Sequence, residues 1–238
     1  MVYMPRIVPA LPCRRSTNKA VVEETRDRVL TAAELRLVWQ LAGSNDFGAI
    51  VRLLVLTGQR REEVGGMLWS ELDLDAALWT IGKDRTKNGL AHSVPLAPTA
   101  VAILRDMPQR DSRDYVFGVG DGPFQGWSNA KAALDERMMA ALGGKKGDAA
   151  KLKPWRLHDV RRTVATRLGD LGALPHVIEA ILNHVSGHRA GVAGIYNRAT
   201  YSAEKREALN RWALAVSDRT SGEARAGGVV IELPERAS

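Results

Sequence analysis

The stretch "GAIVRLLVLTGQRREEVGGML", residues 48 to 68, predicts the architecture of the chain. Its first half belongs to a helix predicted over about residues 46 to 57, which is apolar nearly all round and therefore central to a domain. The pair "TG" is a signal for the helix C-terminus, and "RREEVGGML" begins a second, short helix. Free backbone N–H groups at this second helix start favour an anion beside Arg60 and Arg61. The stretch therefore predicts a helical core with a basic turn at its edge.

The segments around this centre predict further helices and one small sheet. A preceding helix starts at Thr31, which stands in capping-box spacing to Glu34. Residues 71 to 97 carry short β-prone runs separated by turn residues, and Asn88-Gly89 is the strongest hairpin signal. The fold class expected is mainly α with a small antiparallel β-sheet (α+β). The remaining helices are predicted at about 98 to 107, 128 to 142 with Ser128 as N-cap, 158 to 170, 175 to 183 and 202 to 217.

The two ends of the chain differ from its middle. Residues 1–27 mix prolines and charges without a period, so we expect a leader or linker remnant. Residues 28–217 form the expected domain. Residues 218–238 are expected to be a C-terminal tail with one strand-like patch, "VVIEL".

The composition restricts the class of partner and the compartment. Lysine and arginine number 34 against 27 acidic residues, a net charge of +7, which favours a polyanionic partner such as nucleic acid. The single cysteine, Cys13, excludes an intrachain disulfide and fits a reducing compartment. The longest apolar run is too short to span a bilayer, and the N-terminal residues have no signal-peptide pattern. We therefore expect an intracellular, soluble protein with no membrane partner.

Several basic residues have the chemistry to act on a phosphate. On a helix His158 and Arg161 share one face, where an imidazole can move a proton and a guanidinium can bind phosphate oxygens. Lys87 stands at the tip of the predicted hairpin, and His184 follows an apolar helix. Taken singly, each has an ordinary alternative: a solvated basic helix face, a turn lysine or a helix-ending histidine. Their order along the chain is more informative than any one of them.

The order Arg, Lys, His-x-x-Arg, His, Tyr resembles that of the tyrosine recombinases, the integrase family of phages and genomic islands. The similarity runs from about residue 28 to 215. It implies the catalytic-domain fold of that family for residues 28–217. The motifs that carry it are "LTGQRREEVGGMLWSELDL", "TKNGLAHSVPLAP", "LHDVRRTVATRLGDLG", "IEAILNHV" and "GIYNRATY".

The resemblance implies a role for each matching residue. Arg60, Arg161 and His184 would contact the nonbridging oxygens of a DNA phosphate, and Glu63 would hold Arg60 in place. The histidine segment reads Leu-Asn-His here, where the family has Leu-Gly-His. The other implied catalytic residues are Lys87, His158 and Tyr196, and the expected DNA contacts are Arg61, Lys153 and Arg156.

The implied reaction is cleavage and rejoining of DNA strands. The phenolic oxygen of Tyr196 would attack the phosphodiester, with His158 assisting loss of its proton and Lys87 protonating the leaving 5′-oxygen. The 3′-phosphotyrosyl bond conserves the energy of the cut, so strands can be exchanged without ATP. No metal and no cofactor are expected, because two guanidiniums meet the developing charge. Such an enzyme integrates or excises a phage or a genomic island.

Alternatives remain open from the sequence. Tyr201 is a second tyrosine close to Tyr196, expected to be a packing residue. A type IB topoisomerase-like relaxing enzyme shares the chemistry, and a truncated DNA-binding remnant would lack independent activity. The resemblance further implies double-stranded DNA as partner, a free monomer, a tetramer on DNA and a tail that docks on a neighbouring protomer. It places the protein in the bacterial cytoplasm, at the nucleoid. Because residues 1–27 are too few for the family's N-terminal DNA-binding domains, we expect weak, salt-sensitive DNA binding from this chain alone.

Overall fold

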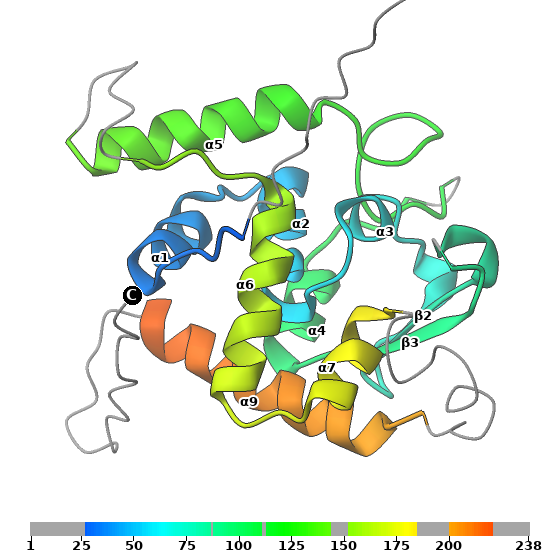
Figure 1. Ribbon diagram of the computed structural model, residues 1–238. Coiled ribbons are helices and arrows are strands. Elements are labelled where there is room, and N and C mark those ends of the chain that lie inside the picture. The colour runs from blue at the N-terminus through cyan, green and yellow to red at the C-terminus, as the bar shows by residue number, and fades with distance from the viewer. Residues whose placement is uncertain (1–26, 87, 111–112, 144–151, 185–199, 221–238) are drawn as a thin grey trace, which may run out of the picture.

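The structure, a computed structural model, describes residues 27–86, 88–110, 113–143, 152–184 and 200–220 (Figure 1). Helices dominate it, and a small three-stranded antiparallel sheet lies to one side, so the predicted mainly α fold with a small sheet is confirmed. The helices are α1 (Ala32–Leu41), α2 (Asp46–Thr57), α3 (Arg61–Gly65), α4 (Pro98–Arg105), α5 (Trp127–Ala141), α6 (Leu157–Asp170), α7 (Pro175–Leu182) and α9 (Ser202–Thr220). The strands are β1 (Leu72–Asp73), β2 (Leu78–Ile81) and β3 (His92–Pro95), and the 3-10 turns are η1 (Trp69–Glu71) and η2 (Lys83–Arg85).

Helix α2 is the centre of the fold, as its uniformly apolar sequence predicts. Nearly all of its residues are buried, and it packs against α1, α3, α4, α6 and α9. Asn45 caps its N-terminus by accepting a hydrogen bond from the Gly48 N–H at 3.0 Å. At the other end Gly58 takes the left-handed conformation (φ +65°) and donates its N–H to the Leu54 carbonyl. The chain can therefore turn sharply from α2 into α3.

The sheet extends the core beyond the helices. Its strand order is β1-β2-β3, and in the β2–β3 ladder Trp79 faces Val94 while Ile81 faces His92. The predicted hairpin turn is confirmed between β2 and β3, where Gly89 (φ +67°) donates its N–H to the Thr86 carbonyl at 3.2 Å. This turn lies at the end of the hairpin that is nearest to α7, to which it is hydrogen-bonded.

Helix α9 ties the helical part to the sheet. It runs along the edge of the molecule opposite α5, with α6 between them (Figure 1). The buried indole of Trp212 donates to the Val55 carbonyl of α2 at 2.7 Å, and the Lys205 ammonium donates to the Ser93 carbonyl of β3 at 2.5 Å. The helix continues to Thr220, three residues past its predicted end at 217. The patch "VVIEL" lies outside the described residues.

The predicted helix starts are confirmed at α1 and wrong at α5. Thr31 and Glu34 form the expected capping box, with the two reciprocal hydrogen bonds at 3.2 and 2.9 Å. Helix α5 starts at Trp127 with Gly126 (φ +83°) as its N-cap, so Ser128 lies inside the helix. The Trp127 ring packs edge-on against Phe124, three residues earlier, at 4.8 Å, and lies against Arg61 of α3 at 5.5 Å, so the first residue of α5 is held by a contact with α3.

None of the helices in the described part of the chain has both the length and the hydrophobicity needed to cross a bilayer.

Candidate active site

The turn between α2 and α3 brings Arg60 to the edge of the core. A Cβ atom at Gly58 would lie 3.0 Å from Val164 Cγ1 of α6 and 3.2 Å from Leu182 Cδ2 of α7. Glycine is therefore required twice, once for its positive φ and once for the close approach of the two helices. Since the turn fits so closely against α6 and α7, Arg60, which is the N-cap of α3, follows directly from a point of contact with both helices.

Glu63 holds Arg60 in place, as the family resemblance implies. One Glu63 oxygen accepts from the Arg60 guanidinium at 2.7 Å, and the other accepts from the Arg60 backbone N–H at 2.9 Å. The Glu63 side chain is 3% exposed and the Arg60 side chain 23%, so the guanidinium retains an open side. A buried carboxylate with two charge-assisted bonds fixes a cation more firmly than a surface pair does.

Arg161 is the most deeply buried cation of the site. Its guanidinium donates to the Gly58 carbonyl at 2.8 Å and to the Leu182 carbonyl, and its residue is 3% exposed. Burial lowers the pKa of Arg161 to about 10, with a further lowering by the Arg60 charge and an opposing effect of Glu63. The group therefore stays positively charged at neutral pH, next to a second guanidinium.

A cavity of about 630 Å³ opens between α3, α5 and α6. Arg60, His158 and Arg161 all line it, so Arg60 meets two residues that lie about a hundred positions later in the sequence. The pKa of His158 is lowered, first by burial and then by the charges of Arg162 and Arg161. The imidazole is consequently neutral near pH 7 and can accept a proton.

His184 follows the C-cap of α7, Asn183. Its backbone N–H donates to the Glu179 carbonyl at 3.1 Å, while its side chain is exposed. Burial of part of the ring lowers the pKa of His184, and the charges of Arg161 and Arg60 lower it further. His184 is not among the residues that line the cavity, but it follows two residues after Leu182, whose carbonyl Arg161 binds.

The C-terminal carbonyls of α7 are bound by side chains from other elements. The Ile181 carbonyl accepts from Gln59 Nε2 at 2.9 Å and from His92 Nε2 at 3.0 Å. Because a carbonyl can only accept, this contact assigns the proton to Nε2 of His92. His92 is 5% exposed, and its pKa is lowered to about 3, first by burial and then by the Lys205 charge. His92 is therefore a neutral, structural histidine.

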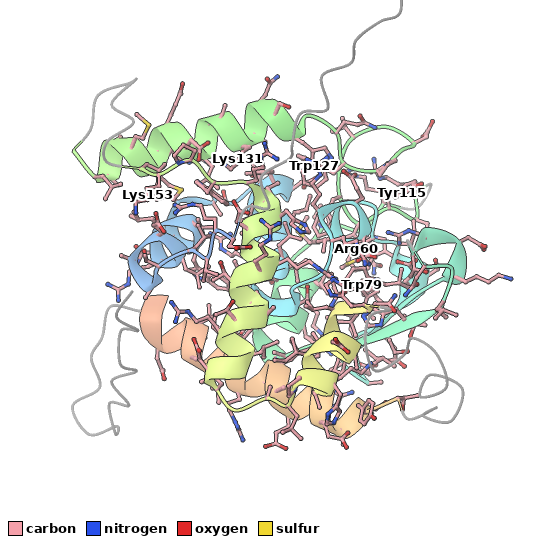
Figure 2. All side chains as sticks on the ribbon, viewed as in Figure 1. Arg60, Trp79, Tyr115, Trp127, Lys131 and Lys153 are labelled. Carbon is pink, nitrogen blue, oxygen red and sulfur yellow. The ribbon has the colours of Figure 1, made fainter. Side chains whose placement is uncertain are left out.

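The three expected DNA contacts lie in different places. Arg61 and Arg156 line the cavity, and Arg61 also lies over the Trp127 ring at 5.5 Å. Lys153 is exposed but does not line the cavity, and Figure 2 shows it away from Arg60, Trp127 and Lys131. Two of the three are thus brought to the site.

Two predicted catalytic residues, Lys87 and Tyr196, lie outside the described residues. Tyr201 lies within them, at the start of α9, with a positive φ of 49°. Its ring contacts the His176 ring at a centroid distance of 4.9 Å, and it is not among the residues that line the cavity. This placement agrees with the packing role expected for Tyr201.

Other residues join the site that the family motifs do not include. Lys131 of α5 lies over the Trp155 ring at 3.9 Å and is paired with Asp135 at 2.5 Å, and both Lys131 and Trp155 line the cavity (Figure 2). Arg85 donates to the Glu63 carbonyl at 2.7 Å and bonds Glu71, which braces the hairpin against α3. The Lys131–Trp155 and Arg85–Glu63 contacts each join residues more than twenty positions apart, so no local motif could reveal them.

The fold and the cavity define a class: a helical domain with a small sheet that assembles two arginines and a histidine around an open pocket. Residues 28–202 match the model of the phage integrase family, and the chain belongs to that family. It is 33% identical to prophage integrase IntA of Escherichia coli K12 over 171 residues, covering 71% of this chain and 38% of the relative. It is 30% identical to prophage integrase IntZ of the same organism, covering 76% of this chain and 42% of the relative. The chain thus spans about two fifths of the length of these curated relatives.

Two solved structures share the fold. The integrase from mycobacterium phage Brujita superimposes with a TM-score of 0.58 at 18% identity, covering 89% of this chain and 61% of that chain. The XerA recombinase superimposes with a TM-score of 0.52 at 22% identity, covering 77% of this chain and 63% of that chain. These likenesses identify the fold as that of tyrosine recombinase catalytic domains.

Proposed function

We propose that this chain is the catalytic domain of a site-specific DNA recombinase, which cuts and rejoins strands through a covalent 3′-phosphotyrosine. Family membership supports this reaction class. The observation that carries it is the meeting of Arg60, His158 and Arg161 at one cavity, with Glu63 buried behind Arg60. Two guanidiniums that line one cavity suit the two nonbridging oxygens of a phosphodiester.

In the proposed reaction the Tyr196 oxygen attacks phosphorus and the bond from phosphorus to the 5′-oxygen breaks. His158, neutral because of its lowered pKa, takes the phenolic proton. Lys87 gives a proton to the leaving 5′-oxygen, which departs as a hydroxyl. Arg60 and Arg161 stabilise the charge that grows on the nonbridging oxygens, and neutral His184 donates one hydrogen bond. The reverse attack by another 5′-hydroxyl joins a new strand.

The proposal includes the partners and the domain arrangement. Double-stranded DNA is the substrate, with Arg61, Arg156 and Lys153 as backbone contacts, and the protein is a monomer when free and a tetramer on DNA. It acts at the nucleoid in the bacterial cytoplasm and serves to integrate or excise a phage or genomic island.

Residues 28–217 form the catalytic domain, residues 1–27 are a leader, and residues 218–238 dock on a neighbouring protomer. Sedimentation with and without DNA, for the full chain and a chain ending at 217, tests the last point: docking requires a larger DNA-bound mass for the full chain.

The test of the chemistry is covalent capture on DNA. A pool of nicked duplexes with randomised sequence is used, in which the short 5′-hydroxyl fragment diffuses away after cleavage and traps the adduct. We expect the unchanged chain and Tyr201→Phe to form a covalent protein–DNA band on a denaturing gel, and Tyr196→Phe to form none. Tyr201→Phe is the matched control, since it removes the same hydroxyl five residues away. A band that persists in Tyr196→Phe and disappears in Tyr201→Phe would overturn the assignment.

A further inference from the structure

Asn183 occupies an unusual position at the C-terminus of α7. It has a left-handed backbone conformation (φ 49°, ψ 44°), and only 4% of its surface is exposed. Left-handed conformation is disfavoured for residues with a side chain, and asparagine tolerates it best after glycine. It is also the position at which the sequence departs from the family's Leu-Gly-His pattern. An asparagine with a buried amide therefore calls for a structural reason that glycine would not supply.

The reason is a pairing of two asparagine side chains. Asn88 Nδ2 donates to Asn183 Oδ1 at 2.8 Å and to the Asn183 carbonyl at 3.3 Å, and Asn183 Nδ2 donates back to Asn88 Oδ1 at 3.3 Å. The Asn88 amide oxygen also accepts from the Leu90 N–H at 3.2 Å, so Asn88 is fixed within its own turn. This asparagine pair joins the hairpin turn of residues 86–90 to the end of α7, across 95 positions of sequence.

The end of α7, to which the asparagine pair joins the hairpin, is itself rigidly held. Gln59 and His92 bind the Ile181 carbonyl, and Arg161 binds the Leu182 carbonyl, so the last turn of α7 is attached to the α2–α3 turn, to β3 and to α6. In the hairpin turn, by contrast, Leu90 is half exposed, and a Cβ at Gly89 would meet nothing within 4 Å. The asparagine pair therefore transfers the fixed position of α7 to the tip of the hairpin.

We infer that the Asn88–Asn183 pair is a positioning device, which holds the hairpin turn against α7 so that the residues next to it in the chain act on one phosphate. This inference rests on the proposed function. The chain neighbours in question are Lys87 and His184, and consecutive Cα atoms lie about 3.8 Å apart. Fixing Asn88 against Asn183 therefore limits the distance between Lys87, the proposed acid, and the two arginines. Neither asparagine makes or breaks a bond with DNA.

The step most sensitive to this positioning is protonation of the leaving 5′-oxygen. A displaced acid slows the rupture of the bond between phosphorus and the 5′-oxygen but leaves DNA binding intact. A 5′-sulfur leaving group needs no such proton, because a thiol is far more acidic than an alcohol and departs as the thiolate. The cleavage rate with a bridging 5′-sulfur should consequently be insensitive to the asparagine pair.

The experiment compares Asn88→Ala, Asn183→Gly and the double variant in the 238-residue chain. Asn183→Gly keeps the left-handed backbone, and Asn210→Ala on α9 is the control outside the site. At saturating nicked DNA, each single variant should cleave 5′-oxygen substrate between about 10-fold and 100-fold more slowly than the unchanged chain, with unchanged DNA affinity. The double variant should be no slower than either single one, since both remove the same contact. With 5′-sulfur substrate all rates should be alike.

Additive effects of the two substitutions, or an equal loss on oxygen and sulfur substrates, would overturn the inference. A second measurement needs no DNA: limited trypsin digestion, followed by mass spectrometry of cleavage after Lys87. Release of the hairpin in Asn183→Gly should raise this cleavage rate at least about fivefold, while Asn210→Ala leaves it unchanged, because native-state proteolysis follows the population of the open form. If the rate of trypsin cleavage after Lys87 is unchanged in Asn183→Gly, the asparagine pair does not hold the hairpin in place. If the unchanged chain forms no covalent adduct, the proposed function fails, and the digestion still decides on the pair.

Discussion

At the scale of single residues, Glu63 and Glu62 show how burial separates two identical side chains. Glu62 forms an exposed pair with Arg61, both more than half exposed. Glu63 is 3% exposed and compensates Arg60, while its charge also acts on Arg161. The adjacent carboxylates therefore differ in what they stabilise, although the sequence presents them side by side.

We expect Glu63→Gln to lower the free energy of unfolding by about 1.5–3 kcal/mol, because a buried hydrogen bond to a charged partner is weakened. Glu62→Gln is the matched control and should change it by less than about 0.5 kcal/mol. Urea denaturation of the two variants measures both values. Equal losses would contradict the assignment of Glu63 as the residue that holds Arg60. The covalent capture rate should also fall in Glu63→Gln alone.

The site residues differ in how far the sequence could predict them. The meeting of Arg60, His158 and Arg161 follows from family spacing, since each belongs to a motif. Lys131 was not predictable, because its place depends on Trp155 and on the packing of α5 over the cavity. Lys153 has the right charge but does not line the cavity, so its charge alone does not indicate its place.

At the scale of elements, the α2–α3 turn shows two separate requirements for glycine. Gly58 and Gly89 have nearly the same φ, +65° and +67°. A Cβ at Gly58 would meet α6 and α7, whereas a Cβ at Gly89 would meet nothing within 4 Å. A comparison of these two glycines therefore separates the cost of backbone strain from the cost of close helix packing.

We expect Gly89→Ala to lower the free energy of unfolding by about 1–2 kcal/mol, the cost of a left-handed alanine. Gly58→Ala should cost this amount and at least about 1 kcal/mol more, because overpacking forces α6 and α7 apart. Urea denaturation checks the difference. Equal losses in the two variants would show that the helices yield freely and that the turn is not a packing constraint.

Helix boundaries were predictable where a local signal decides them. Thr31 with Glu34 and the Gly58 stop are interactions between near neighbours in sequence, so the starts and ends they define are confirmed. Ser128 is also a good local cap, but α5 starts at Trp127, whose ring packs against Arg61 and Gly65 of α3. The capping signal at Ser128 therefore did not decide where α5 starts, because the contact between Trp127 and α3 forms only in the folded chain.

At the scale of the whole molecule, a buried histidine makes stability depend on pH. His92 connects β3 to α7 and, with its pKa lowered to about 3, is neutral in the folded chain. In the unfolded chain its pKa is about 6.5. Between these values the unfolded state binds the extra proton, so stability falls as pH decreases from about 6.5 toward 3.

We expect the unchanged chain to lose about 2 kcal/mol more stability between pH 7 and pH 5 than His92→Gln, which cannot titrate. His158 and His184 also have lowered pKa values, but they are present in both proteins and cancel in the comparison. Denaturation midpoints at several pH values measure the difference. Parallel pH profiles for the two proteins would show that His92 is protonated without cost in the folded chain.

The end of α7 has a consequence for sequence variation among relatives. Its carbonyls and cap are bound by Gln59, His92, Arg161 and Asn88, which come from four places in the chain. A change at one of these leaves a buried partner unsatisfied, so neutral drift at one position requires a matching change at another. We therefore expect positions 88 and 183 to covary, with asparagine at 183 found where 88 is asparagine and glycine at 183 found with a wider choice at 88.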